Sequence, residues 1–120
     1  MSIYQLPVSN LPNQSFDTTI PNKNGDNITW YFRLVWNLCT ETWEISIAKN
    51  SETNYIALNI PVITSDNLLE YMMYKEDLGK IIVMNSGKSL VEKPNTENLG
   101  SDYLILWDNL DGESTVDTGL

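Results

Sequence analysis

Histidine is absent from the 120-residue sequence. It is the usual general base near neutral pH and the commonest metal ligand in proteins. Its absence excludes Ser-His-Asp and Cys-His catalytic arrangements and every zinc site that uses imidazole. An enzyme with this sequence would have to work with carboxylates, tyrosine or lysine. We therefore expect a protein that is not an enzyme and that carries neither a cofactor nor a metal ion.

Cysteine and long apolar runs are also scarce. The single cysteine, Cys39, has no partner for an internal disulfide, so we expect a fold that does not depend on an oxidising compartment. Residues 1–6 have neither the basic nor the apolar region of a signal peptide. No apolar run approaches the ~20 residues that a membrane-spanning helix needs. These features predict folding in a cytoplasm and no membrane partner.

Basic residues are few, with 7 Lys and Arg against 16 Asp and Glu, for a net charge of −9. Nucleic-acid binding requires lysines and arginines that cluster against the phosphates. Here the basic residues are scattered along the sequence, at Lys23, Arg33, Lys49, Lys75, Lys80, Lys88 and Lys93. We therefore expect no nucleic-acid partner.

The residues that are present predict one domain rich in β-strands. Apolar residues make up 42% of the sequence, near the globular average. Residues 28–36 alternate, with Ile28, Trp30, Phe32, Leu34 and Trp36 on one face. Residues 42–48 repeat the pattern, and we expect Trp43, Ile45 and Ile47 to point inward and Glu44 and Ser46 outward. The short link between the two segments predicts an antiparallel hairpin.

Five further segments have the composition of strands, namely 3–8, 16–20, 55–62, 80–84 and 103–107. In the third of these, Ile56, Leu58 and Ile60 are expected on one face, and Pro61 is expected to end an edge strand.

Residues 66–73 break the alternation, because leucine and methionine recur four residues apart after Asn67, a plausible helix N-cap. The predicted fold class is therefore mainly β: a small antiparallel β-barrel or a compact sandwich with one short helix. We place a single β-barrel-like domain at residues 1–108 and an acidic flexible tail at 109–120.

The four tryptophans allow two interpretations. They could form a sugar-stacking platform on a β-sandwich, or they could fill the core. The core interpretation is favoured, because each tryptophan is in phase with the apolar residues of its strand. Tyr31 and Arg33 lie on the opposite face, where we expect exposed contacts.

A set of short segments, taken in order, carries a resemblance to a known family. The segments are Tyr4-Gln-Leu-Pro7, residues 27–37, Trp43–Ile47, residues 61–69, Leu78-Gly79, and Pro94 with Asn98-Leu-Gly100 and Tyr103–Trp107. Their order and spacing resemble the cyanophage baseplate plug family, which comprises small proteins of contractile phage tails. The resemblance covers roughly residues 3–108. Thr64-Ser65 depart from the pattern, which has a glycine there.

The resemblance implies a structural component of a phage or prophage tail baseplate, a plug or hub-associated protein located in the virion. Its implied partners are other baseplate proteins (hub, tube, spike or wedge), in an assembly where it is oligomeric. Synthesis would take place in the cytoplasm of the bacterial host. The candidate interaction residues are Tyr31, Arg33, Asn98, Leu99 and Gly100.

Two other classes of function stay open at this point. A carbohydrate-binding β-sandwich module is motivated by the tryptophan and tyrosine content. A small carboxylate-based enzyme would need two acids that face each other in a cleft, and no pair in the sequence predicts that arrangement.

Overall fold

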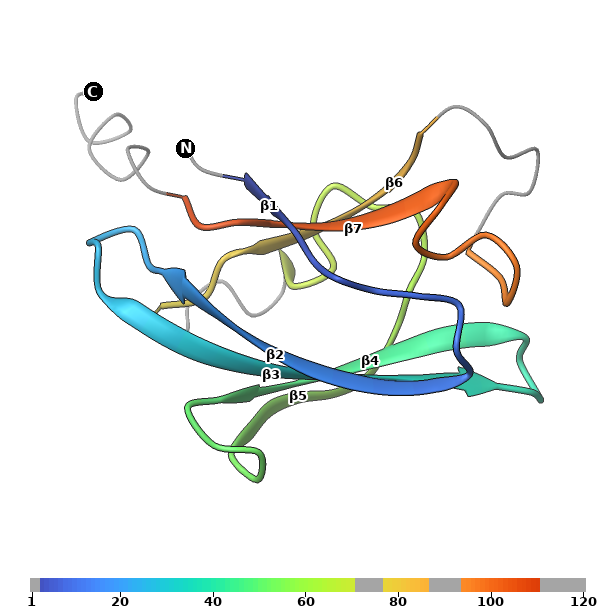
Figure 1. Cartoon of the computed structure of the whole chain (residues 1–120), viewed down its shortest axis with the longest axis horizontal. Coiled ribbons are helices and arrows are strands. Elements are labelled where there is room, and N and C mark those ends of the chain that lie inside the picture. Colours follow the sequence, from blue (N-terminus) through green and yellow to red (C-terminus); the bar gives the residue numbers. More distant parts are fainter. Residues whose placement is uncertain (1–2, 71–76, 87–93, 111–120) are drawn as a thin grey trace.

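The computed structural model describes residues 3–70, 77–86 and 94–110. Within these ranges the chain forms seven strands: β1 Ile3–Gln5, β2 Asn13–Pro21, β3 Asn27–Asn37, β4 Thr42–Lys49, β5 Tyr55–Pro61, β6 Lys80–Asn85 and β7 Tyr103–Asp108. They make two antiparallel sheets, with the orders β1-β7-β6 and β2-β3-β4-β5. The two sheets form two layers, and the chain crosses between them after β1 and again after β5 (Figure 1).

The predicted mainly-β class is confirmed, and all seven predicted strands are present in the described residues. The hairpin of β3 and β4 is also confirmed, with Asn37 opposite Thr42 at its end. Of the two architectures predicted, the structure has the sandwich, because the two described sheets do not join into a barrel. β1 is shorter than predicted, since Pro7 has no N–H to continue the ladder.

Of the helix predicted over residues 66–73, residues 66–69 are not helical, and Glu70 has a 3₁₀ conformation. Leu68 and Leu69 lie in a turn, and the Leu68 N–H donates to the Ile81 carbonyl on β6 at 2.8 Å. The Asn67 side chain accepts from the Leu69 N–H at 2.9 Å, as a cap would, and from the Ile81 N–H at 3.3 Å. These bonds hold the segment along β6 instead of in a helix. Residues 71–73 lie outside the described residues.

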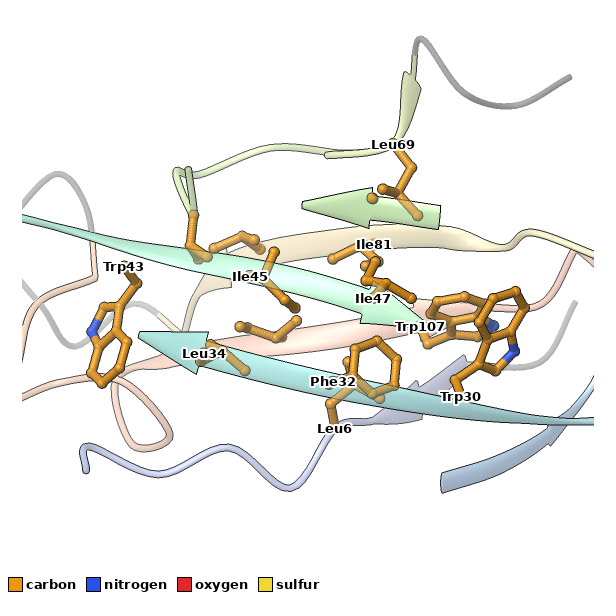
Figure 2. Close-up of a cluster of buried hydrophobic side chains, with 14 of the residues drawn as sticks. Leu6, Trp30, Phe32, Leu34, Trp43, Ile45, Ile47, Leu69, Ile81 and Trp107 are labelled. Atoms are coloured by element: carbon orange, nitrogen blue, oxygen red, sulfur yellow. The ribbon is translucent and has the colours of Figure 1, made fainter. Parts of the chain in front are cut away.

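The hydrophobic core lies between the two sheets (Figure 2). Trp107 of β7 packs against two rings of β3, with centroid distances of 5.0 Å to Trp30 and 5.9 Å to Phe32. Trp30, Trp43 and Trp107 are each at most 1% exposed. Trp36 is half-buried and meets Trp43 edge-to-face at 5.6 Å. The core interpretation of the tryptophans is therefore confirmed.

The face of β5 predicted from Ile56, Leu58 and Ile60 is wrong at Leu58, whereas Ile56 and Ile60 pack against the core. Register shifts against β4 place Ala57 opposite Ile47, where it is buried, and leave Leu58 57% exposed. A bulge adds a residue to one strand and reverses the alternation beyond it. The sequence pattern alone carries no mark of this shift.

Ser46 lies opposite Arg33 on the outer face, as predicted, but the same bulge buries it. Asn59 adopts a positive φ of 53°, and its N–H donates to the Ser46 Oγ at 2.9 Å. Ser46 is only 1% exposed as a result. The prediction that Pro61 ends an edge strand is confirmed, because β5 is the last strand of its sheet and ends there.

A hydrogen bond just after β7 connects the three-stranded sheet to the end of β2 in the other sheet. Asn109, which we assigned to the acidic tail, is buried, and its Nδ2 donates to the Pro21 carbonyl at 2.9 Å. Residues 111–120 lie outside the described residues, so the flexible tail stays a prediction. Among the described residues, no helix is long and apolar enough to cross a membrane.

A polar junction centred on Asp77 links three separate segments. The Lys49 Nζ at the end of β4 lies 2.6 Å from Asp77 Oδ2. The Nδ2 of buried Asn22 donates to Asp77 Oδ1 at 2.6 Å, while the Asn22 Oδ1 accepts from the backbone of the β2–β3 turn. The hydrogen bonds from Lys49 and then from Asn22 hold the pKa of Asp77 below its usual value.

Replacing Asp77 with asparagine is expected to lower the free energy of unfolding at neutral pH by about 1 kcal/mol, because the ion pair with Lys49 is lost. Since the folded-state pKa is depressed, the carboxylate stabilises the fold above its ordinary pKa of 3.8. That contribution disappears as the pH falls through the folded-state pKa. The difference between wild type and Asp77→Asn should therefore shrink below that pH in urea titrations.

The matched control is Asp17→Asn, because the structure shows no ion pair for Asp17 within the described residues. We expect its effect on the free energy of unfolding to be small. An equal loss of stability in both variants, with the same pH profile, would contradict the junction.

Candidate interaction surface

The outer face of the four-stranded sheet carries polar and aromatic side chains in aligned rows. Opposite residues of antiparallel strands share a face. Asp17 of β2 is opposite Tyr31 of β3, Tyr31 is opposite Ala48 of β4, and Ala48 is opposite Tyr55 of β5. This row therefore crosses all four strands. Ala48 is the small residue at its centre and is fully buried.

An open depression of about 420 Å³ lies over this face. Tyr31, Arg33 and Tyr55 line it together with the carboxylates of Asp17 and Glu52. The Arg33 guanidinium lies 5.6 Å from the centre of the Tyr55 ring, within the range of a cation–π interaction. Arg33 is exposed and Tyr31 is half-buried, on the face that the alternation predicted.

The sequence missed the other residues of this depression, among them Asp17, Glu52 and Tyr55. Asp17 could have been found, because pairing the segments around residues 20 and 28 as a hairpin places it opposite Tyr31. Tyr55 could not, because its neighbours across the sheet depend on the shifted register of β5. Glu52 lies in the loop between β4 and β5. No periodic signal marks a loop residue.

The other three candidate residues form a corner that precedes β7. Asn98 and Leu99 are buried, at 6% and 2% exposure. The Asn98 carbonyl accepts from the backbone N–H groups of residues 101–103, and its Oδ1 accepts from the Asn95 N–H at 2.7 Å. Gly100 has a φ of +88°, and a Cβ there would lie 2.6 Å from the Val8 carbonyl oxygen.

The structure therefore does not bring this corner together with Tyr31 and Arg33. The corner leads into the three-stranded sheet, whereas Tyr31 and Arg33 lie on the outside of the other sheet. The buried side chains of Asn98 and Leu99 hold the corner itself. A contact role for any of the five candidate residues stays a prediction.

The chemistry at the depression suits recognition: two aromatic rings, one guanidinium and two carboxylates face an open surface. Within the described ranges, no group of three Cys, Asp or Glu side chains is placed to hold a metal ion.

Gly100→Ala is expected to destabilise the protein by about 2–4 kcal/mol, as the sum of left-handed backbone strain and overpacking against Val8. Gly25 is a matched control, because its φ is +90° and a Cβ there would have no neighbour within 4 Å. Gly25→Ala should cost about 1 kcal/mol, from the strain alone. Urea unfolding of the two variants measures the difference. Equal losses would show that the corner relaxes away from Val8.

Comparison with known proteins gives one match to a family. The model of the family described as cyanophage baseplate Pam3 plug gp18 matches residues 3–111. No curated protein matches the sequence significantly. The matched range includes all seven strands of both sheets, together with the depression and the corner. The resemblance noted from the sequence is confirmed, and the chain belongs to the family of the cyanophage baseplate Pam3 plug gp18.

Proposed function

We propose that this protein is a non-enzymatic structural component of a phage or prophage tail baseplate, held in place by contacts with other baseplate proteins. The observation that carries the proposal is the match of residues 3–111 to the baseplate plug family. On this proposal the protein is made in the cytoplasm of the bacterial host and ends up in the tail of the virion.

The described structure supports a role as a compact structural subunit. Two sheets enclose a core that includes three fully buried tryptophans. The whole sequence has a net charge of −9, which favours neighbours with basic surfaces. The partners on this proposal are hub, tube, spike or wedge proteins. Several copies surround the tail axis, because tail assemblies are symmetric.

Purified tails of the parent phage or prophage are expected to contain this chain at a fixed ratio to the other baseplate proteins. Quantitative mass spectrometry of gradient-purified particles measures the ratio, and a cryo-EM map locates the chain. Particles from a host that lacks the gene are the control. If intact, infectious or contractile tails contain none of this chain, the proposal is wrong.

A second candidate is a carbohydrate-binding module, and one observation favours it. Tyr31 and Tyr55 line an open depression with two carboxylates, the groups that sugar-binding surfaces use. The tryptophans no longer support it, since Trp30, Trp43 and Trp107 are in the core. The Arg33 guanidinium also covers one face of Tyr55. The baseplate role is therefore the better supported of the two.

A glycan panel titrated into the protein should produce no saturable change in the NMR signals of Tyr31 and Tyr55. Tyrosine signals are the right readout, because three of the four tryptophans are buried and would not report on a surface ligand. If a glycan does bind, with affinity lost in Tyr31→Ala and kept in Tyr31→Phe, the carbohydrate-binding candidate replaces the baseplate proposal.

A further inference from the structure

The four edge strands of the two sheets differ in how well they could accept another strand. β1 has only 3 residues. The outer edge of β6 is bonded to Ser65 and Leu68, through the Val83 and Ile81 backbones. β5 is interrupted by register shifts against β4. β2, in contrast, runs for 9 residues in unbroken register with β3. Among the described strands, β2 is therefore the best template for a further strand.

The backbone groups that β2 turns outward can be identified. At one end the Trp36 N–H donates to the Pro12 carbonyl, and at the other the Asn22 N–H donates to the Asp26 carbonyl. Because hydrogen-bonded pairs alternate along an antiparallel ladder, even-numbered residues of β2 bond to β3. The N–H and C=O groups of Ser15, Asp17 and Thr19 therefore point away from the sheet. No strand pairs with them among the described residues.

We propose that the outer edge of β2 pairs with an extended segment of a neighbouring baseplate protein that places a basic residue opposite Asp17 and apolar residues on the inner face. This inference rests on the proposed baseplate role and names the partner's chemistry. The added strand would extend the sheet beyond β2 and satisfy the outward groups of Ser15, Asp17 and Thr19.

The charge on the outer face selects a basic residue opposite Asp17 on the partner. Asp17 is exposed on β2, and Glu52 lies in the same depression. A lysine or arginine opposite Asp17 would make a cross-strand ion pair on the face that carries Tyr31. Arg33, the basic residue of the depression, is already placed over Tyr55.

The inner face selects apolar residues at the alternate positions. Phe16 points to this side, is half-buried, and stacks on Phe32 with a centroid distance of 5.2 Å. An apolar side chain on the added strand would cover the remaining exposed part of Phe16. The two faces together specify a strand with a basic residue opposite Asp17 and apolar residues on the inner face.

A second copy of this chain is a poor occupant. Antiparallel pairing of two β2 strands about their centre would bring Asp17 of one copy opposite Asp17 of the other. Like charges directly opposite each other destabilise a strand pair. A charge at an exposed edge is also a common protection against self-association.

Amide hydrogen exchange followed by NMR tests the edge directly. In the free protein, the amides of Ser15, Asp17 and Thr19 should exchange fast, and those of the even-numbered residues between them slowly. A peptide as long as β2, 9 residues, with lysine and valine in alternation is the probe. It should slow exchange at the three outward amides selectively. Binding that leaves these amides unprotected would overturn the proposal.

Charge reversal tests the choice of partner. Asp17→Lys should weaken binding of the lysine–valine peptide by about tenfold, since an attraction becomes a repulsion. A glutamate–valine peptide should instead bind the variant better than the wild type. Asp26→Lys is the matched control, because Asp26 is exposed in the β2–β3 turn, away from the outward groups. Equal effects of the two substitutions would reduce the binding to general charge attraction and overturn the proposal.

The failure of this inference can be told apart from failure of the baseplate role. If tails contain the wild-type chain and take up Asp17→Lys as well as Asp26→Lys, the β2 edge is not the contact, and the baseplate role stands. If tails contain no wild-type chain, the baseplate role is wrong even where the peptide binds β2. Dimers of the free protein in analytical ultracentrifugation that Asp17→Lys alters would make a second copy the occupant and overturn the choice of partner.

Discussion

The packing of Trp107 against Trp30 and Phe32 is the contact on which the rest of the sandwich depends. It joins the three-stranded sheet to the centre of the four-stranded sheet, at ring distances of 5.0 and 5.9 Å. It also constrains the chain before β6, because a Cβ at Gly79 would lie 2.5 Å from the Trp107 indole nitrogen. Large buried rings contribute much of the free energy of folding in a domain of this size. The spacing of the two layers follows from this contact.

Because the large rings face inward, the outside of the four-stranded sheet is left to smaller and polar groups. Tyr31, Arg33 and Tyr55 gather there with two carboxylates, and β2 borders the same face. The surface and the edge are thus adjacent parts of one region. A neighbour that pairs with β2 would also reach the depression, which is why backbone pairing and charge recognition belong in one proposal.

Much of the fold could be predicted, because the alternation of apolar and polar residues along a strand is a local signal, and the structure keeps it in most strands. β3 and β4 show it most clearly, with Trp30 and Ile45 buried as their phase requires. Prediction failed where a distant partner overrode the local pattern. The helix expected near Asn67 is replaced in its described part by hydrogen bonds to Ile81 on β6. Only the part of the depression on β3 was found, because Tyr31 and Arg33 lie on one strand, whereas Tyr55 comes from another.

The sequence by itself determined the class of the fold, the seven strands, the core role of the tryptophans and the family. Composition and periodicity indicate which residues avoid water, and the fold class, the strands and the core residues follow from that. The family followed from the order and spacing of the segments that resemble it. Only the tertiary structure decided that two sheets stack as a sandwich, that Asn98 and Leu99 are buried, and that β2 is left at an edge. Each of these depends on which strands become neighbours. That choice is made by contacts between residues far apart in the chain, such as Trp30 with Trp107.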